Sequence, residues 1–451
     1  MKKGLHWFRK DLRVQDNRSL KSISNTVDSL SCVYVISSLT QIEKSKVPLQ
    51  QTELIGEHKQ RFVKQSLVDL DSSLKHFGQG LCVLAIASKE ETSNDGIINI
   101  LIEYIDKHDI THVSCEWHAG VNERHQWALL QQLRPELTYI QANSATLYEE
   151  DDLPFSVSDM PDTFSPFRRK VEKHSRVAES IRLNKLPPPI VAETEQQKLT
   201  GLQEISLIES SLESEYSWLQ GGETSALSAL IYYFWESDNI ASYKETRNGL
   251  DGRDFSSKLS LWLAHGCISP RQIAAELRNY ESQRTKNDST YWLFFELLWR
   301  EFFHWQLFKH QARFFYFNGI QDKALDTTHD PSTYLSWVNG NTGFHIVDAC
   351  MKQLKRTGFM SNRGRQLVAS CFVHELAQDW RYGAAYFEYQ LIDFDVASNY
   401  GNWQYLAGVG SDPRGHRQFN LEKQTEIYDP SRWFIKRWLL QDPRLREDEL
   451  N

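Results

Sequence analysis

The apolar residues in the first third of the chain follow two alternating patterns. Short apolar runs predict strands at residues 5–8, 32–36, 81–87, 112–117 and 138–141. The segments between them have helical periodicity; Leu67, Leu70, Leu74 and Phe77, for example, are spaced by three and four. Strands that alternate with helices are typical of βαβ units, so this part of the chain predicts an open parallel sheet.

The pattern changes twice after residue 141. Three prolines at 187–189 open a polar, acid-rich stretch that reaches residue 215 and is typical of a linker. After Gly221 the chain consists of long helical segments with few β-branched residues. We therefore predict a Rossmann-like α/β domain at 1–150, a linker region at 151–220 and a mostly α-helical domain at 221–445.

Composition narrows the class of protein. The chain has 451 residues, 40% hydrophobic and 24% charged, which is usual for a globular protein of two or three domains. Its 14 Trp and 23 Phe invite a search for a stacked ligand. The net charge of −8 argues against a protein that coats nucleic acid with its whole surface, but it is compatible with a local basic groove.

Cysteine usage and hydropathy indicate the compartment. The six Cys form no CxxC pair and lie mostly in apolar stretches, which predicts buried free thiols in a reducing environment. No segment is apolar for long enough to span a membrane, and the first residues, MKKGLHWFRKDLR, lack the apolar core of a signal peptide. We therefore expect a cytoplasmic protein, with a monomer as the default.

Residues 243–260, YKETRNGLDGRDFSSKLS, gather hydroxyl groups and a cation where a helix is expected to begin. Ser256, Ser257, Lys258 and Ser260 lie within five positions. Hydroxyls, backbone amides and a lysine at such a point suit a phosphate or pyrophosphate. A serine-rich helix cap without a ligand is the structural alternative.

Residues 295–305, FELLWREFFHW, place an acid, a tryptophan and an arginine within two helical turns. Glu296 and Arg300 are i,i+4 neighbours and could form an ion pair on the helix surface. Trp299 is one turn from Glu296 and could share a cavity wall with it. A core tryptophan beside a solvated ion pair is the alternative.

Two arginines stand out in residues 358–366, GFMSNRGRQ. Arg363 and Arg365 are two positions apart and point in different directions, so one can serve an inner ligand and the other an outer phosphate. Asn362 precedes them. A solvated loop is the alternative.

Residues 391–405, LIDFDVASNYGNWQY, combine Asp393, Asp395 and Asn399 with Trp403 and Tyr405. Closely spaced acids, an amide and aromatic rings suit a heterocycle with several donors and acceptors. A metal site is the alternative, but no ligand set with metal-like spacing completes it, so we expect no metal.

Taken in this order, these segments resemble the photolyase/cryptochrome family. The similarity runs from HWFRKDLRVQDN near the start to YDPSRWFIKRWL near the end. Several strings are similar to the DASH branch: DTFSPFRRKVE, GGETSAL, YKETRNGLDGRDFSSK, NDSTYWLFFELLWRE and GFMSNRGRQ. The resemblance implies an N-terminal α/β domain and a helical C-terminal domain that holds a bent FAD.

Matching positions imply which residues contact FAD. The implied set is Tyr243, Ser256, Ser257, Lys258, Leu259, Ser260, Arg300, Asn362, Arg365, Asp393, Asp395 and Asn399. The residues from 243 to 260 would meet the pyrophosphate side, and Asn399 would face the flavin N5. The resemblance also implies that reduced, light-excited flavin donates an electron to a flipped-out cyclobutane pyrimidine dimer, which then splits.

The same resemblance implies substrate contacts and departs at two of them. Glu296 would hydrogen-bond the pyrimidines, Trp299 would stack on them, and Arg363 would bind a DNA phosphate. Tyr405 and Gln366, which complete the expected catalytic set with Asn362, stand where dimer-repair enzymes carry Trp and often Met. This smaller, more polar wall predicts repair in single strands, where base flipping costs little, and weak or absent repair in duplexes.

Electron supply departs from the family as well. Trp403 and Trp380 match the first two members of the usual three-tryptophan relay, but the third position falls at about Thr327. Trp337 matches a different family tryptophan. We therefore expect slow photoreduction or an exit through another aromatic residue such as Tyr386.

The string GVNER at 120–124 is similar to folate-binding relatives. By that resemblance Asn122 and Glu123 would contact a 5,10-methenyltetrahydrofolate antenna. A helix N-terminus with polar caps is the structural alternative.

Two functions from different classes follow. The first is a light-dependent lyase that acts on pyrimidine dimers in DNA, chiefly single-stranded. The second is a blue-light photoreceptor or nucleic-acid-binding regulator without repair, for which RNA is also a possible partner. A nicotinamide-dependent flavin oxidoreductase is disfavoured because the chain has no dinucleotide-binding fingerprint.

Overall fold

The computed structural model describes residues 1–36, 56–85, 94–191, 216–412 and 417–440. Its first part contains a parallel five-stranded sheet of order β3-β2-β1-β4-β5. The strands are β1 (Lys3–Phe8), β2 (Ser29–Ile36), β3 (Leu81–Ala85), β4 (His112–Glu116) and β5 (Thr138–Ala142). All five predicted strands are confirmed, and only residues 86 and 87 of the third prediction lie outside the described residues.

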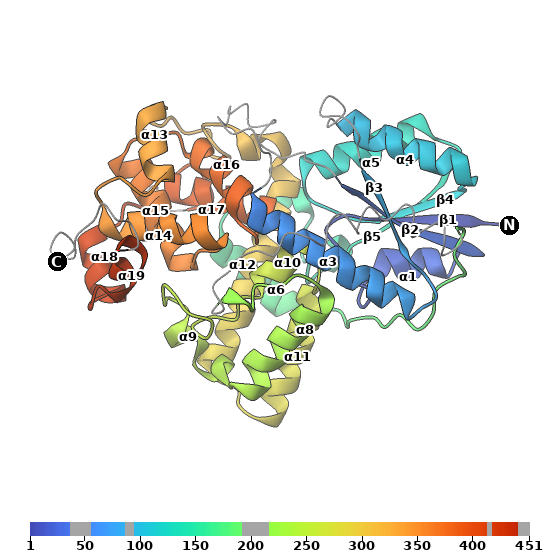
Figure 1. Ribbon diagram of the computed structural model, residues 1–451, viewed down its shortest axis with the longest axis horizontal. Coiled ribbons are helices and arrows are strands. Elements are labelled where there is room, and N and C mark those ends of the chain that lie inside the picture. Colours follow the sequence, from blue (N-terminus) through green and yellow to red (C-terminus); the bar gives the residue numbers. More distant parts are fainter. Residues whose placement is uncertain (37–55, 86–93, 192–215, 413–416, 441–451) are drawn as a thin grey trace.

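The two faces of the sheet contribute to different cores. The helices around it are α1 (Arg18–Ser24), α3 (Glu57–Lys75), α4 (Asn94–His108) and α5 (Val121–Leu133). Leu5, Trp7 and Val33 form one core with residues of α4 and α5. Phe8 and Leu30 belong to a second core that continues into the helical part of the molecule. The sheet is therefore joined to the rest of the protein through one of its faces (Figure 1).

The later parts of the chain that the structure describes are mostly helical, as predicted, and they pack around one long helix, α12 (Asp288–His310). The other helices are α6 (Phe164–His174), α8 (Glu223–Ile231), α9 (Tyr243–Thr246), α10 (Ser260–His265), α11 (Pro270–Gln283), α13 (Pro331–Val338), α14 (His345–Thr357), α15 (Asn362–Ser370), α16 (Trp380–Gln390), α17 (Val396–Ala407), α18 (Leu421–Tyr428) and α19 (Trp433–Leu439). Residues on every side of α12 are buried, as is typical of a helix at the centre of a domain. No helix in the described parts of the chain is both long and apolar enough to cross a membrane.

The predicted linker is described only in part. Within 151–191 the chain forms α6, and Phe167 of this helix packs on Phe302 of α12 with a centroid separation of 5.3 Å. Residues 192–215, which hold most of the polar stretch, lie outside the described residues. The domain boundaries therefore stay a prediction.

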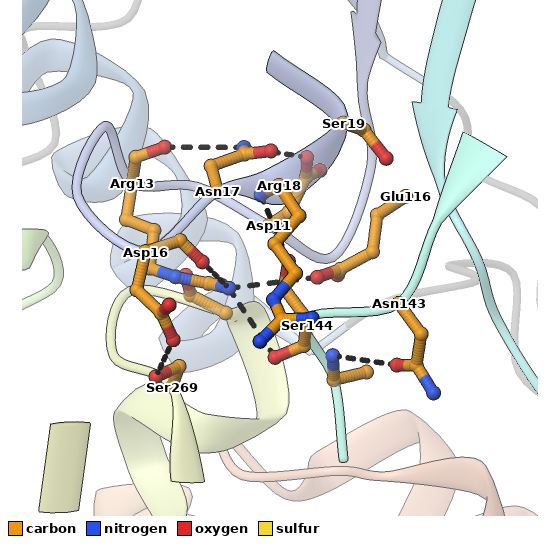
Figure 2. A network of polar contacts seen from close by, with 12 residues as sticks. Asp11, Arg13, Asp16, Asn17, Arg18, Ser19, Glu116, Asn143, Ser144 and Ser269 are labelled. Atoms are coloured by element: carbon orange, nitrogen blue, oxygen red, sulfur yellow. Dashed lines mark hydrogen bonds and ion pairs between the residues drawn. The ribbon is translucent and has the colours of Figure 1, made fainter. Parts of the chain in front are cut away.

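Buried charges fasten the α/β domain to the helices. Arg13 donates to the carbonyl oxygens of Asp16 and Gly266 at 2.9 and 2.8 Å. Asp16 in turn accepts from the Ser269 hydroxyl and from Arg271 Nε, the latter at 3.2 Å. Figure 2 shows the contacts of Arg13, Asp16 and Ser269 within this network. Hydrogen bonds therefore join the loop after β1 to the start of α11.

Candidate cofactor and substrate site

A cavity of about 430 Å³ lies in the helical domain, at the centre of the predicted chemistry. Eighteen predicted residues line it: Tyr243, Ser256, Ser257, Lys258, Leu259, Ser260, Glu296, Trp299, Arg300, Asn362, Arg363, Arg365, Gln366, Asp393, Asp395, Asn399, Trp403 and Tyr405. The structure therefore brings the four segments together around one space. Its volume is within the usual range for a small-molecule or cofactor site.

A buried cation marks the serine-rich end of the cavity. Helix α10 begins at Ser260, close to the predicted helix start, and Lys258 just before it has a left-handed backbone with φ of 55°. That conformation is uncommon for a residue with a side chain and occurs where a loop is held in place. The Lys258 side chain is buried, and burial lowers its pKa to about 8 although Asp251 favours the charged form.

Asp393 joins three of the segments. Its carboxylate accepts from Ser260 Oγ at 2.7 Å and from Arg365 Nη2, which is 2.9 Å from both oxygens. Arg365 also donates from Nε to the carbonyl of Met360 at 2.9 Å. This geometry fixes the inner arginine of the predicted pair and leaves Asp393 fully partnered at the cavity wall.

Asp395 is held at both of its oxygens. Oδ1 accepts from the backbone N–H of Ser398 at 2.7 Å and caps α17, while Oδ2 lies 2.8 Å from His304 Nε2. Arg300 Nη2 lies 3.8 Å from the same Oδ2. Burial by itself raises the pKa of Asp395, but His304 and Arg300 outweigh it and hold that pKa well below the usual range. Asp395 is therefore a carboxylate in the cavity wall.

The two predicted amides also line the cavity. Asn399 donates from Nδ2 to the carbonyl of Ala384 at 3.0 Å, which ties α17 to α16. Asn362 is the first residue of α15. The hydroxyl of Ser361 caps this helix by accepting a hydrogen bond from the backbone N–H of Gly364. Both side chains therefore come from ordered helix positions.

Glu296 does not form the ion pair that its sequence spacing allows. Its carboxylate binds Arg247 Nη1 at 2.6 Å, whereas Arg300 donates to the carbonyl of Ala145 and faces Asp395. The i,i+4 alternative is therefore wrong, because Arg300 is drawn towards the α/β domain. Burial raises the pKa of Glu296, and Arg247 opposes that rise.

Trp299 and Tyr405 form a corner of the cavity. Phe164 of α6 stacks on Trp299 with 3.7 Å between ring centroids and 10° between planes. Tyr405 approaches Trp299 edge-on, at 5.8 Å and 82°. The guanidinium of Arg417 lies 4.7 Å from the centroid of the Tyr405 ring. One face of Trp299 is thus fixed by Phe164, and Tyr405 shares a face with a cation.

The outer arginine of the predicted pair is directed away from the inner one. Arg363 donates to Asn248 at 3.2 Å and to Gln424 at 3.5 Å, and it lies 4.5 Å from the centroid of the Tyr428 ring. Arg365 instead binds Asp393. The expectation that the two side chains point in different directions is confirmed.

The predicted electron-transfer residues differ in their surroundings. Trp403 lines the cavity, and its ring lies 6.2 Å from that of Trp337. Trp380 is fully buried but does not line the cavity. The centroid of its ring lies 6.3 Å from that of Tyr400. From Trp337 the aromatic contacts continue to Tyr386 at 5.7 Å. Tyr386 is therefore linked to Trp403 through Trp337, a residue that sequence reasoning set aside.

The segment in which the resemblance places the third relay member lies beside Trp380. The backbone N–H of Thr328 donates to Ala377 at 3.0 Å, and Asp379 donates back to Thr328 at 2.7 Å. Thr327 is half-buried next to this pairing. The predicted place of the third relay member is thus next to the start of α16, where the chain has threonine.

The predicted antenna residues lie in the first turn of α5, away from the cavity. Asn122 is 8% exposed, and its Oδ1 has no hydrogen-bond partner among the described residues. Glu123 Oε2 is 3.6 Å from His118 Nδ1, and Arg9 donates to the Glu123 carbonyl at 2.9 Å. The next residue, Arg124, lies 5.1 Å from the ring of Phe308 on α12. These side chains therefore border the junction of the two domains.

Sequence reasoning missed three polar residues that complete the site. Arg247 and Arg417 line the cavity, and His304 supports Asp395 from behind. Their partners are 49, 5 and 91 positions away, respectively. Only Arg417 has a partner close in sequence, Asp412. The described residues contain no cluster of His, Cys, Asp and Glu that could hold a metal ion.

Comparison with known proteins identifies the family of this chain. Residues 4–189 match the family model for DNA photolyase, and residues 292–450 match that for the FAD binding domain of DNA photolyase. A cryptochrome structure from Synechocystis has a TM-score of 0.86 and 34% sequence identity, and the match covers 100% of this chain and 91% of that one. A class III photolyase from Agrobacterium tumefaciens has a TM-score of 0.80 and 25% identity, with coverage of 100% and 89%.

Two curated relatives narrow the assignment. Cryptochrome DASH of Idiomarina loihiensis is 46% identical over 435 residues, which cover 96% of this chain and 92% of the relative. Cryptochrome DASH of Vibrio parahaemolyticus is 45% identical, with coverage of 99% and 95%. The chain therefore belongs to the photolyase/cryptochrome family, in which it is of the cryptochrome DASH type and carries a photolyase-type FAD-binding domain.

Proposed function

We propose that this protein is a blue-light-dependent FAD flavoprotein that binds DNA and splits cyclobutane pyrimidine dimers, with a preference for single strands. One observation carries the proposal. Glu296 and Trp299, the expected substrate contacts, line the same cavity as the residues expected to hold FAD. A signalling flavoprotein without repair has no need of a half-buried acid and an ordered tryptophan at that position.

The donor set of the cavity lining fits FAD. At its serine-rich end, Lys258 offers a buried cation for the pyrophosphate. Across the cavity, Arg365, Asp395 and Asn399 offer donors and acceptors for the polar edge of an isoalloxazine. When bound, reduced and excited by blue light, FAD supplies the electron that starts the splitting of the dimer.

Residues of this chain would position the dimer. Glu296 has a raised pKa and is anchored by Arg247, so its carboxyl group can hydrogen-bond the pyrimidines and stabilise charge that develops on them. Trp299 cannot swing because Phe164 stacks on one of its faces, and it offers the other to a base. Arg363 lies at the cavity lining and is our candidate for a DNA phosphate.

The single-strand preference rests on the part of the cavity wall that adjoins Trp299. Tyr405 has Arg417 over its ring and Gln366 is polar, so this wall offers less apolar stacking surface than a second tryptophan would. Stacking contributes about 1–3 kcal/mol per base. Extruding a base from a duplex costs a few kcal/mol, and from a single strand much less. The stacking free energy is close to the cost of extruding a base from a duplex. A wall that stacks less well therefore abolishes repair in duplexes before it abolishes repair in single strands.

Two auxiliary roles complete the proposal. Trp403, at the cavity wall, is the first electron donor, and its contact with Trp337 gives an exit towards Tyr386 besides the one through Trp380. Trp337→Phe is expected to slow photoreduction, and an unchanged rate would exclude that exit.

Asn122, whose buried Oδ1 has no hydrogen-bond partner among the described residues, and Glu123 would contact a folate antenna. Pigment extraction that releases no folate would exclude the antenna.

The test uses protein that has been reduced chemically, so that the result does not depend on the electron relay. Oligonucleotides with one dimer, single-stranded or duplex, are illuminated with blue light, and dark samples serve as controls. Light-dependent loss of dimers in the single strand, with little loss in the duplex, supports the proposal. No loss in either, with FAD bound, favours instead a photoreceptor or regulator that binds nucleic acid.

A further inference from the structure

A second, much smaller cavity lies between the two domains, behind Asp395. Its volume is about 10 Å³, which is close to the space that one water molecule needs. Lys10 and His118 line it from the α/β domain, and Arg300, His304 and Asp395 line it from the helical domain. A void of this size with several polar neighbours is expected to hold an ordered water molecule.

His304, one of the residues that line this cavity, has a ring nitrogen without a hydrogen-bond partner among the described residues. His304 is 2% exposed, and its Nε2 is 2.8 Å from Asp395 Oδ2. Its Nδ1 is buried and has no hydrogen-bond partner among the described residues. Buried polar atoms almost always have a partner, which is often an ordered water molecule. The small cavity that His304 lines provides the place for one.

The protonation states follow from the surroundings. Burial lowers the pKa of His304, Arg300 lowers it further and Asp395 opposes both. Burial also lowers the pKa of His118 to about 4, although Glu123 favours its charged form. Both imidazoles are therefore neutral at neutral pH. Because Asp395 is a carboxylate, the proton of His304 resides on Nε2, and Nδ1 is left as an acceptor.

We propose that His304 is a positioning residue for Asp395, anchored from behind by one water molecule in the interdomain cavity. The backbone of Ser398 holds Oδ1 and His304 holds Oδ2, so the carboxylate keeps one orientation in the wall of the large cavity. This proposal rests on the proposed function only in that Asp395 serves a bound flavin. A fixed negative charge there would lower the reduction potential of that flavin.

The test compares two buried His–Asp pairs. His304→Phe removes the donor and the acceptor, and His304→Gln retains an N–H donor. The matched control is His6→Gln, because His6 lies 3.1 Å from Asp11 with both side chains fully buried in the α/β domain. The reduction potential of bound flavin is measured against pH. His304→Phe is expected to raise the potential and to make it depend on pH at the acidic end, where Asp395 then titrates; His304→Gln restores the wild-type profile.

A second readout needs no flavin. Nitrogen NMR of the imidazoles in the full chain is expected to show His304 protonated at Nε2 with a hydrogen-bonded Nδ1, and carbon NMR is expected to show Asp395 titrating at higher pH in His304→Phe. A proton on Nδ1, or an unchanged Asp395, overturns the proposal. So does a His304→Phe potential equal to that of wild type. Failure of the wild-type chain to bind FAD would refute the proposed function, and the NMR result would still decide the role of His304.

Discussion

Buried charged side chains have different roles at the interface between the two domains and in the cavity wall. At the interface, Arg271 is fully buried and donates to Asp16 and to the carbonyls of Asn143 and Thr146. In the cavity, Lys258 is almost as buried but lines open space. The interface uses charge to fix two surfaces together, whereas the cavity retains charge for a ligand.

This difference shows how the two regions contribute to stability. A buried charge with good partners costs little to keep and much to break, because the remaining partner is left uncompensated. A buried charge that faces a ligand site lowers the free energy of unfolding of the unliganded protein. Binding of the ligand offsets this loss of stability. Variants of the two regions should therefore change stability in opposite directions.

The largest effect is expected at the interface. Arg271→Met leaves Asp16 buried without its cation and should lower the free energy of unfolding by about 3–5 kcal/mol, measured by denaturant titration. The control is Arg284→Met, which breaks a 2.9 Å pair with Asp238 that is exposed on both sides and should cost no more than about 1 kcal/mol. Equal losses in the two variants would remove the distinction on which the comparison rests.

The next effect is a dependence on pH. Burial raises the pKa of Glu116, at the end of β4 beside Arg13, from 4.5 to about 8. Between these two values the unfolded chain loses a proton that the folded protein keeps, so stability falls as pH rises. We expect wild type to lose about 5 kcal/mol relative to Glu116→Gln between acidic and mildly alkaline pH. Parallel stability curves for the two proteins would contradict this expectation.

In the cavity, Glu296→Gln should impair function and spare stability. Loss of a charged hydrogen bond to the substrate costs about 1.5–3 kcal/mol, which corresponds to roughly a 10- to 100-fold drop in dimers split per absorbed photon. Asp288→Asn is the control, since Asp288 is exposed on the same helix. A variant that repairs normally would exclude Glu296 as a substrate contact.

The smallest expected change in stability is at Lys258, and it is the most direct test of the difference between the cavity and the domain interface. Lys258→Met should leave the free energy of unfolding of flavin-free protein unchanged or raise it by about 1 kcal/mol, because a buried cation is replaced by an apolar side chain of similar length. The same variant should bind FAD at least several-fold more weakly, while Lys258→Arg retains part of the affinity. A clear loss of stability in Lys258→Met would show that the cavity charge is structural.

The sequence predicted elements better than the contacts between them. The strands follow from apolar runs, and the four site segments follow from side chains close together in the chain. Sequence spacing suggested Arg300 as the partner of Glu296, but the partner is Arg247, because the carbonyl of Ala145 in the other domain draws Arg300 away. His304 gave no signal at all, since its role depends on Asp395, 91 positions later. Local patterns carry no information about such distant pairs.

The fastening of the loop after β1 to α11 has a consequence for synthesis on the ribosome. Asp16 emerges 255 residues before Arg271, an interval of roughly 10–50 s at ordinary rates of translation. During that time the nascent α/β domain presents an unpaired carboxylate and Arg13 on the face that will later receive the helices. A polypeptide truncated near residue 150 would retain this exposed, incompletely compensated face permanently, so it should aggregate or recruit chaperones although its sheet is complete.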